Sequence, residues 1–119
     1  MSDEVIRQRI GSAAEELAAR HLLAHGLHIL ERNFRVRGGE IDLIARDGKS
    51  LVFVEVRLRT RPDFGGAAAS ITGKKQQRII LAARHYLQTH GEQACRFDAV
   101  LLDALDAQAI EWIKGAFSA

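Results

Sequence analysis

The sequence contains only one cysteine, one proline and one tryptophan, and it lacks any long apolar run. The single cysteine, Cys95, excludes an intramolecular disulfide and is typical of a reducing compartment. With one proline and 47% hydrophobic residues, the composition argues against a disordered chain. No stretch predicts a signal peptide or a membrane-spanning helix, so we expect a cytoplasmic protein without a membrane partner.

The 119 residues are enough for one domain, 1–119, with a substantial core. The net charge is only +2, but residues 32–78 hold eleven cations and five acids. Thirteen arginines stand against four lysines, and arginine is the better bidentate partner for phosphate. The charge pattern leaves two alternatives open, which are a polyanionic partner and an ordinary solvated surface.

The segment from Gly39 to Arg59 carries the clearest pattern in the chain. Two apolar, β-branched runs are joined by Asp47-Gly48, which predicts a β-hairpin. Each run contains one acid, Asp42 in the first and Glu55 in the second. Carboxylates are rarely buried without a partner, so we expect a cation between these two.

The predicted hairpin also fixes which side chains face each other. With Asp47-Gly48 as the turn, Asp42 is expected opposite Phe53 and Glu40 opposite Glu55. Asp42 and Glu55 then become diagonal neighbours with Cα atoms roughly 7 Å apart. Such a pair suits Mg²⁺ or Mn²⁺. The residues expected on this one face are Glu40, Asp42, Phe53, Glu55 and Arg57.

The remaining patterns predict an α/β fold. Helical spacing of apolar residues covers 3–25 and 72–90, and glycines follow both segments. The order helix, three strands, helix, one or two strands indicates a three-layer sandwich around a mixed central sheet. The other expected elements are a strand at 27–34, a flexible connection at 35–39, a long loop at 60–73, and strands at 96–102 and 109–113.

Several further residues have both a functional and a structural interpretation. Glu15 lies on a strip of small helical residues, so it either reaches an interior site or stays exposed. Lys74, Lys75 and Arg78 begin the second helix, where they either bind phosphate or extend into water. Arg96 and Asp98 are expected on one face, where they pair with each other or with charges near the hairpin, and we interpret Asp98 as part of a structural ion pair.

Two other groups of residues favour a structural role. His21 and His25 have a spacing that can bind zinc, but no third ligand accompanies them, so core or cap histidines are the better interpretation. Trp112 is expected in the core rather than as a stacking platform for bases.

An Asp on one strand, a Glu on the next and an acid on the preceding helix resemble the restriction-endonuclease-like nucleases. Within that group the whole chain resembles the YraN-type family of small bacterial proteins, which is related in fold to archaeal Holliday-junction resolvases. The segments that carry the resemblance are Gly11 with Glu15, Arg32-Asn33, residues 39–44, residues 53–56, Phe64-Gly65, Lys74-Lys75 with Arg78, residues 96–98, and Ala116-Phe117.

The resemblance implies a restriction-endonuclease-like fold and Mg²⁺-dependent hydrolysis of a phosphodiester, with Asp42 and Glu55 as metal ligands. Glu15 would be a further acidic member of the catalytic set. Arg57 stands where the family pattern has Lys. Arginine stays charged, so Arg57 can stabilise charge on phosphate but cannot act as a general base. If the long loop delivers them to the site, Lys74 or Lys75 can take the place of that lysine. The set assigned to nucleic-acid binding is Arg35, Arg37, Arg59, Arg61, Lys74, Lys75 and Arg78.

The sequence leaves three functions open. The first is a metal-dependent endonuclease acting on DNA or another nucleic acid, with branched DNA suggested by the resemblance. The second is a nucleic-acid-binding module that has lost cleavage. The third is a protein-interaction domain in which acids and arginines form a salt-bridge network. Resolvases act as dimers, so the resemblance also implies a homodimer.

Overall fold

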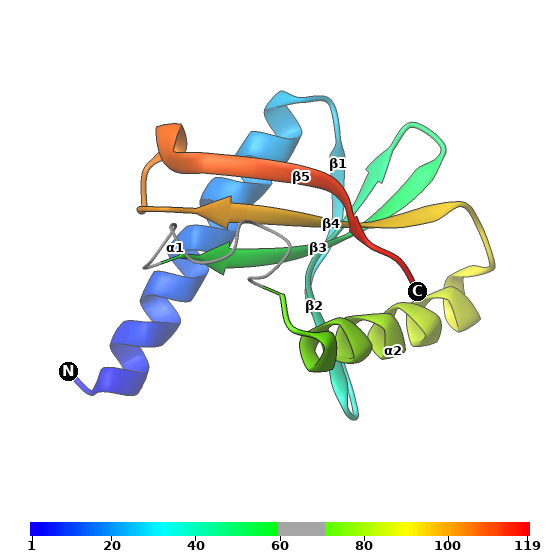
Figure 1. Ribbon diagram of the computed structural model, residues 1–119, viewed down its shortest axis with the longest axis horizontal. Coiled ribbons are helices and arrows are strands. Elements are labelled where there is room, and N and C mark those ends of the chain that lie inside the picture. The colour runs from blue at the N-terminus through cyan, green and yellow to red at the C-terminus, as the bar shows by residue number, and fades with distance from the viewer. Residues whose placement is uncertain (60–70) are drawn as a thin grey trace.

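The computed structural model describes residues 1–59 and 71–119 and has the predicted α/β architecture (Figure 1). A five-stranded sheet is covered by one helix on each face, so the predicted three-layer sandwich is confirmed. No helix in these two ranges combines the length and apolarity needed to cross a membrane. The elements are α1 (Asp3–Ala24), β1 (His28–Val36), β2 (Gly39–Asp47), β3 (Ser50–Leu58), α2 (Gly73–His90), β4 (Cys95–Leu102), the short 3₁₀ helix η2 (Ala107–Ala109) and β5 (Ile110–Phe117).

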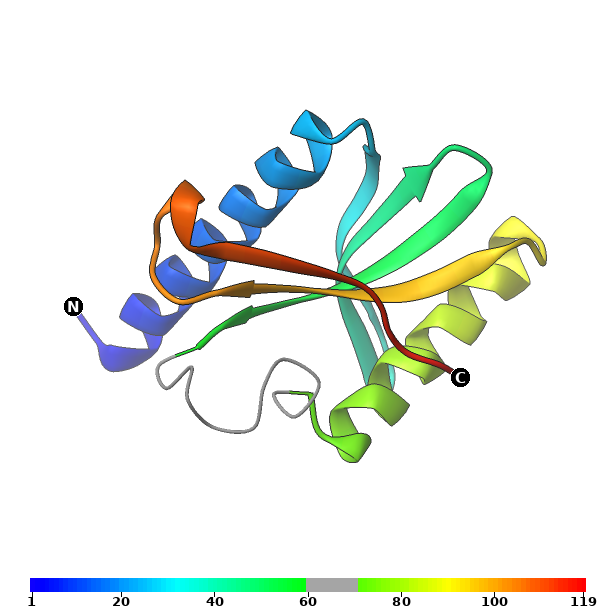
Figure 2. The ribbon, with the colours of Figure 1, turned by 45° about the horizontal axis from the view of Figure 1, so that its top comes forward.

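The sheet is mixed and its strands lie in chain order, β1-β2-β3-β4-β5. Only β3 and β4 are parallel, and α2 forms the crossover between them. Side chains on one sheet face pack with α2, including Phe53 and Tyr86. Those on the other face pack with α1, including Val54 and Leu22. Figure 2 shows the two helices on opposite sides of the twisted sheet.

Both helices begin and end where the sequence predicts. The Ser2 hydroxyl accepts from the Val5 N–H at the start of α1, and Gly26 follows its end with a φ of +91°. Thr72 caps α2 through the Lys75 N–H at 3.2 Å. These local signals fix the helix bounds without tertiary contacts, which explains why they could be predicted.

Two strand predictions were too short. Residues 35–39 are not a flexible connection, because β1 continues to Val36 and β2 begins at Gly39. The turn between them is completed by Gly38, whose φ is +86°. The last strand runs from Ile110 to Phe117 rather than ending near residue 113. This strand lies at the edge of the sheet and contains polar and small residues, so its sequence pattern is weak. Its pairing with β4 sets its length.

The register of the β2–β3 hairpin differs by two residues from the prediction. Asp47 pairs with Ser50, so residues 48 and 49 form the turn. Phe53 consequently lies opposite Ile44 and not opposite Asp42. Because the shift is an even number of residues, it does not exchange the two faces of β3.

β2 and β3 separate beyond the Leu43–Val54 pair, the last one in their ladder. From there β2 continues beside β1 alone, and β3 continues beside β4 alone. Figure 2 shows the two strands diverging. The expected pairing of Glu40 with Glu55 is therefore wrong, since Glu40 pairs with Arg35 of β1. The next residues after the last pair are Asp42 and Glu55.

Candidate active site

Asp42 lies where β2 and β3 separate, a point that we call the fork. Its Oδ2 accepts a hydrogen bond from the Val56 backbone N–H at 2.8 Å. The neighbours Ile41 and Leu43 pack on the α2 and α1 sides respectively, and Ile44 packs on the α2 side again. Strict alternation along β2 therefore fails at Asp42. The local bend leaves this carboxylate at the fork instead of in either hydrophobic core.

The neighbouring strand bends at the same level. Asn33 of β1 has a φ of +52°, which is uncommon for a residue with a side chain, and asparagine tolerates it better than most. It lies between the pairs that join β1 to Leu43 and Ile41. The Arg32 side chain forms an ion pair with Glu16 of α1. Phe34, two residues later in β1, packs instead on the α2 side of the sheet. The bend thus crosses both strands beside Asp42.

Glu55 is the least satisfied buried carboxylate in the described part of the chain. Its residue is 3% exposed, and its Oε2 has no hydrogen-bond partner among the described residues. Burial, reinforced by the charge of Asp42, raises the pKa of Glu55 to about 8, and Lys75 and Arg57 oppose that rise. A carboxylate held in this way gains from any further cation.

Asp42 is perturbed in the same direction. Burial raises the pKa of Asp42, and the hydrogen bond from Val56 and the charge of Lys75 counteract part of the rise. The structure therefore brings the two predicted metal ligands together and makes both of them costly to ionise. A pair of carboxylates that resists ionisation is typical of functional sites, although structural clusters also produce it.

Lys75 enters this cluster from the first turn of α2. Its Nζ lies 3.3 Å from Glu40 Oε1 and 3.7 Å from Glu55 Oε1. Lys75 was assigned to phosphate contact from its place at a helix N-terminus, whereas the structure places it against two carboxylates. The sequence held no signal for these contacts, because 35 residues separate Lys75 from Glu40.

Gly39 allows α2 to approach the fork closely. A Cβ at Gly39 would lie 2.4 Å from the Arg78 carbonyl oxygen and 3.1 Å from the Ala82 nitrogen. No side chain fits at that distance from helix backbone, so only glycine permits this contact between β2 and α2. Gly39 therefore allows α2, the helix that carries Lys75, to pack directly against β2.

Replacing Gly39 with Ala should force α2 away from β2. We expect a loss of about 1–3 kcal/mol in the free energy of unfolding, the usual cost of overpacking. Urea unfolding would measure it. Gly11→Ala is the matched control, because a Cβ there meets nothing within 4 Å and should leave stability unchanged or raise it. Equal stability of the two variants would contradict the close-packing argument.

Glu15 lies beside the fork on the α1 side. It is half-buried, and burial together with the charge of Asp42 raises its pKa, while a hydrogen bond with Asn33 lowers it. Of the two predicted alternatives, the structure favours the one in which Glu15 reaches the site. Glu15 lines a cleft of about 340 Å³ with Gln8, Gly11, Ser12, Asn33 and Arg35.

The predicted nucleic-acid-binding cations divide into groups. Arg35 lies 3.5 Å from Glu40, so it borders the carboxylate cluster. Arg59 is only 13% exposed and forms ion pairs with Asp103 and Glu111 away from the cluster. Exposed positions hold Arg37, Lys74 and Arg78, whereas Arg61 lies outside the described residues, as does most of the predicted loop 60–73.

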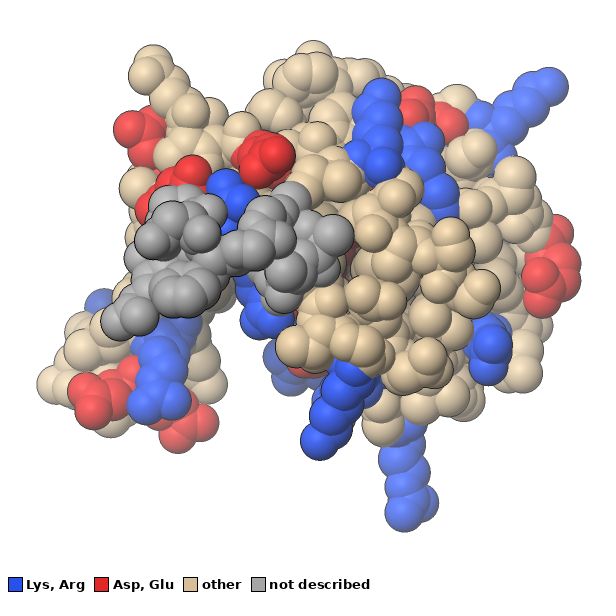
Figure 3. Space-filling view, viewed as in Figure 1, with Lys and Arg blue, Asp and Glu red and all other residues tan. Residues whose placement is uncertain are grey.

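Basic side chains do not merge into one patch on the face seen in Figure 3. They lie at several separate places on this face, some of them beside acidic side chains. Arg57 is half-buried, and its positive charge opposes the rise in the pKa of Glu55. The positive charge nearest the carboxylates therefore comes from Lys75, Arg57 and Arg35.

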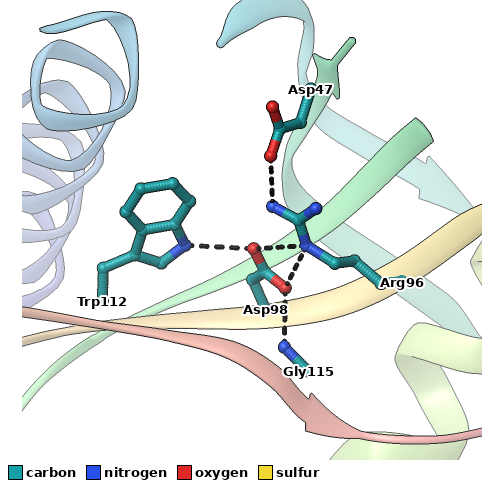
Figure 4. A network of polar contacts seen from close by, with 5 residues as sticks. All are labelled: Asp47, Arg96, Asp98, Trp112 and Gly115. Carbon is teal, nitrogen blue, oxygen red and sulfur yellow. Dashed lines mark hydrogen bonds and ion pairs between the residues drawn. The ribbon is translucent and has the colours of Figure 1, made fainter. Parts of the chain in front are cut away.

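Asp98 is a second buried acid, with every oxygen satisfied. It accepts hydrogen bonds from Arg96 Nε, Trp112 Nε1 and the Gly115 N–H at 2.9 to 3.2 Å (Figure 4). Arg96 also reaches Asp47 at 2.9 Å. The predicted structural ion pair is confirmed, and so is the expected contact with a charge of the hairpin, whereas no sequence pattern indicated the donors contributed by β5.

The two histidines form contacts typical of a helix end. His25 Nδ1 lies 2.7 Å from the His21 carbonyl oxygen, and both rings contact Trp112. Burial and the neighbouring His25 lower the pKa of His21. In residues 1–59 and 71–119, no three His, Cys, Asp or Glu side chains gather as a metal-binding group. Metal binding at the fork would therefore rest on Asp42 and Glu55 with water.

Comparison with known proteins agrees with the motifs. The model of the uncharacterised protein family UPF0102, which is the YraN family, matches residues 14–102. A UPF0102 protein of Dechloromonas aromatica is 63% identical over 109 residues, which cover 92% of this chain and 88% of the relative. For the Methylobacillus flagellatus protein the identity is 54% over 112 residues, covering 94% and 99%. The Hahella chejuensis protein is 55% identical over 111 residues, covering 92% and 90%.

Proposed function

We propose that this chain, which belongs to the uncharacterised protein family UPF0102, is a Mg²⁺- or Mn²⁺-dependent endonuclease with its centre at Asp42 and Glu55. The observation that carries the proposal is the buried Glu55 carboxylate beside Asp42, with an Oε2 that has no partner among the described residues. Burying such a group costs stability, and an apolar residue would avoid that cost. A site that retains it is suited to binding a ligand.

The donor set fits a hard divalent ion. Asp42 and Glu55 offer carboxylate oxygens, and Mg²⁺ is commonly bound by one or two carboxylates with water and phosphate completing its shell. The absence of a third acidic ligand in the described cluster agrees with that pattern. When bound, the ion would polarise the phosphate and lower the pKa of a bound water.

The reaction is hydrolysis of a phosphodiester. A water oxygen forms a bond to phosphorus and releases a proton to solvent, the bond from phosphorus to the leaving oxygen breaks, and that oxygen takes a proton from solvent. Asp42 and Glu55 would hold the metal ion. Arg57 supplies fixed positive charge for the phosphate oxygens, because arginine remains protonated. Glu15 adds negative charge beside Asp42 and completes the acidic set.

Nucleic acid is the substrate class that the surrounding charges favour. Arg35 borders the cluster, and Arg37, Lys74 and Arg78 are exposed for contacts with a sugar-phosphate backbone. Neutralising phosphates with such cations makes affinity fall steeply with salt. Contacts with the sugar-phosphate backbone carry no sequence information, so we expect affinity without strong sequence preference.

A nuclease assay with Mn²⁺ on single-stranded and branched DNA tests the proposal. The wild-type protein should cleave, whereas Asp42→Asn and Glu55→Gln should each lower the rate by about 10²-fold or more by removing a metal ligand. Arg57→Lys restores the residue of the family pattern and should retain or raise activity. Glu92→Gln, at an exposed position, is the matched control.

Two outcomes would replace the proposal with another function. Metal binding and salt-dependent DNA affinity without cleavage would indicate a non-catalytic nucleic-acid-binding module. Failure to bind Mg²⁺ or Mn²⁺, with Asp42→Asn behaving like the wild type, would favour a protein-interaction domain whose acids and arginines form a structural network.

A further inference from the structure

Lys75 is held where a metal ion would compete with it. Its ammonium lies within 4 Å of carboxylate oxygens on β2 and β3, at 3.3 Å from Glu40 and 3.7 Å from Glu55. The side chain is 23% exposed, whereas that of Glu55 is 4% exposed, so the lysine lies between solvent and the buried acid. The other Glu55 oxygen, Oε2, has no partner among the described residues.

The backbone that carries Lys75 is fixed on both sides. Thr72 Oγ1 accepts the Lys75 N–H at 3.2 Å, which sets the first turn of α2. One turn further along, the helix backbone contacts Gly39 so closely that no Cβ would fit. The ammonium is therefore delivered to the fork by packed secondary structure, and its own four-carbon chain gives it local reach.

We propose that Lys75, and not a residue of β3, is the lysine of this centre, and that its ammonium occupies the cation position beside Glu55 until a metal ion enters. This inference rests on the proposed function. Once displaced from Glu55, the ammonium donates a hydrogen bond to a non-bridging oxygen of the scissile phosphate. It stays protonated throughout, so the step transfers no proton and adds only positive charge to the transition state.

The position of Arg57 agrees with this division of roles. Two residues after Glu55 the family pattern has a lysine, and here the chain has an arginine. Both Arg57 and Lys75 lower the pKa of Glu55, and Lys75 is also among the groups that lower the pKa of Asp42. The charge of Lys75 therefore acts on both expected metal ligands.

Lys75→Gln, with Lys49→Gln as the control, separates this role from a structural one. Lys49 is an exposed lysine in the turn between β2 and β3, outside the proposed site. Calorimetry should show Lys75→Gln binding Mn²⁺ about three- to tenfold more tightly than the wild type, because a competing charge is removed. The same variant should cleave DNA about 10²-fold more slowly. Lys49→Gln should match the wild type in both measurements.

Lys75→Arg guards against loss of folding. It keeps the charge, so it should melt near the wild-type temperature, bind Mn²⁺ like the wild type and retain at least a tenth of the cleavage rate. If Lys75→Gln binds Mn²⁺ no more tightly than Lys49→Gln and cleaves as fast, Lys75 has no such role and only this inference fails. If the wild-type protein binds no Mn²⁺, the proposed function fails as well.

Discussion

Glu55→Gln should make the protein more stable than the wild type at pH 8 and leave its stability nearly unchanged at pH 5. The pKa of Glu55 is raised from 4.5 to about 8 in the folded protein. Between these values the folded state holds a proton that the unfolded state has released. The free energy of unfolding therefore falls as pH rises from about 4.5 to 8, by up to about 1.4 kcal/mol per pH unit.

Glutamine is neutral at every pH and keeps the size of the protonated acid, so it removes this penalty. We expect a gain of about 3 kcal/mol at pH 8, equivalent to a melting temperature about 10 °C higher. Thermal melts of both proteins at pH 5, 6, 7 and 8 would measure the difference. Glu15 also has a raised pKa and is present in both proteins, whereas Asp42 interacts directly with Glu55, so the difference between the two sets of melts reports the titration of the Asp42–Glu55 pair.

Glu92→Gln is the control, because it makes the same chemical change at an exposed position. Its melting curve should follow the wild type at every pH. Adding Mn²⁺ should then raise the melting temperature of the wild type at pH 8 and not that of Glu55→Gln. Parallel pH dependence in the wild type and Glu55→Gln would show that the buried carboxylate is not under the electrostatic strain inferred here.

The two acids at the fork could be predicted because an acid inside an apolar strand can be recognised from the sequence alone. Asp42 and Glu55 each interrupt a β-branched run, and strand parity placed Glu55 on the Phe53 face whichever residues formed the turn. The pairing itself could not be fixed, since Asp47-Gly48 and Gly48-Lys49 are both acceptable turns. The choice between them depends on β1 and β4, which pair with the outer edges of the hairpin.

Tertiary contacts account for what the sequence could not predict. Lys75 reaches the fork only because Gly39 lets α2 lie against β2, and no pattern links these two residues along the chain. The bend at Asn33 and Asp42 is likewise a property of two paired strands. The resemblance to the family gave the acids their expected roles and made Lys74 and Lys75 candidates for the missing lysine, but it did not indicate the place of Lys75 between Glu40 and Glu55.

Asp98→Asn should be the most destabilising of the substitutions considered. Both Asp98 oxygens accept from donors, since Arg96 Nε contacts each, Trp112 Nε1 contacts Oδ2 and the Gly115 N–H contacts Oδ1. An asparagine in either orientation would turn its NH₂ group toward a donor. The residue is fully buried, so water cannot compensate, and we expect a loss of about 3–5 kcal/mol.

Urea unfolding would measure the loss, and the fluorescence of Trp112, the one tryptophan, would report whether its indole has left the network. Asp103→Asn is the matched control, because it breaks an ion pair whose acid is 43% exposed and should cost less than about 1 kcal/mol. Equal midpoints for the two variants would refute the assignment of Asp98 to the framework.

The contrast between Asp98 and Glu55 separates framework from site in this fold. They lie on adjacent strands, β4 and β3, and both are nearly or fully buried. Asp98 is surrounded by donors and joins β5 to β4, so its neutral amide analogue should weaken the protein. Glu55 has an oxygen without a partner, so its neutral analogue should strengthen the protein at pH 8. Opposite signs for one type of substitution would identify Glu55 as the carboxylate retained for binding a cation and not for folding.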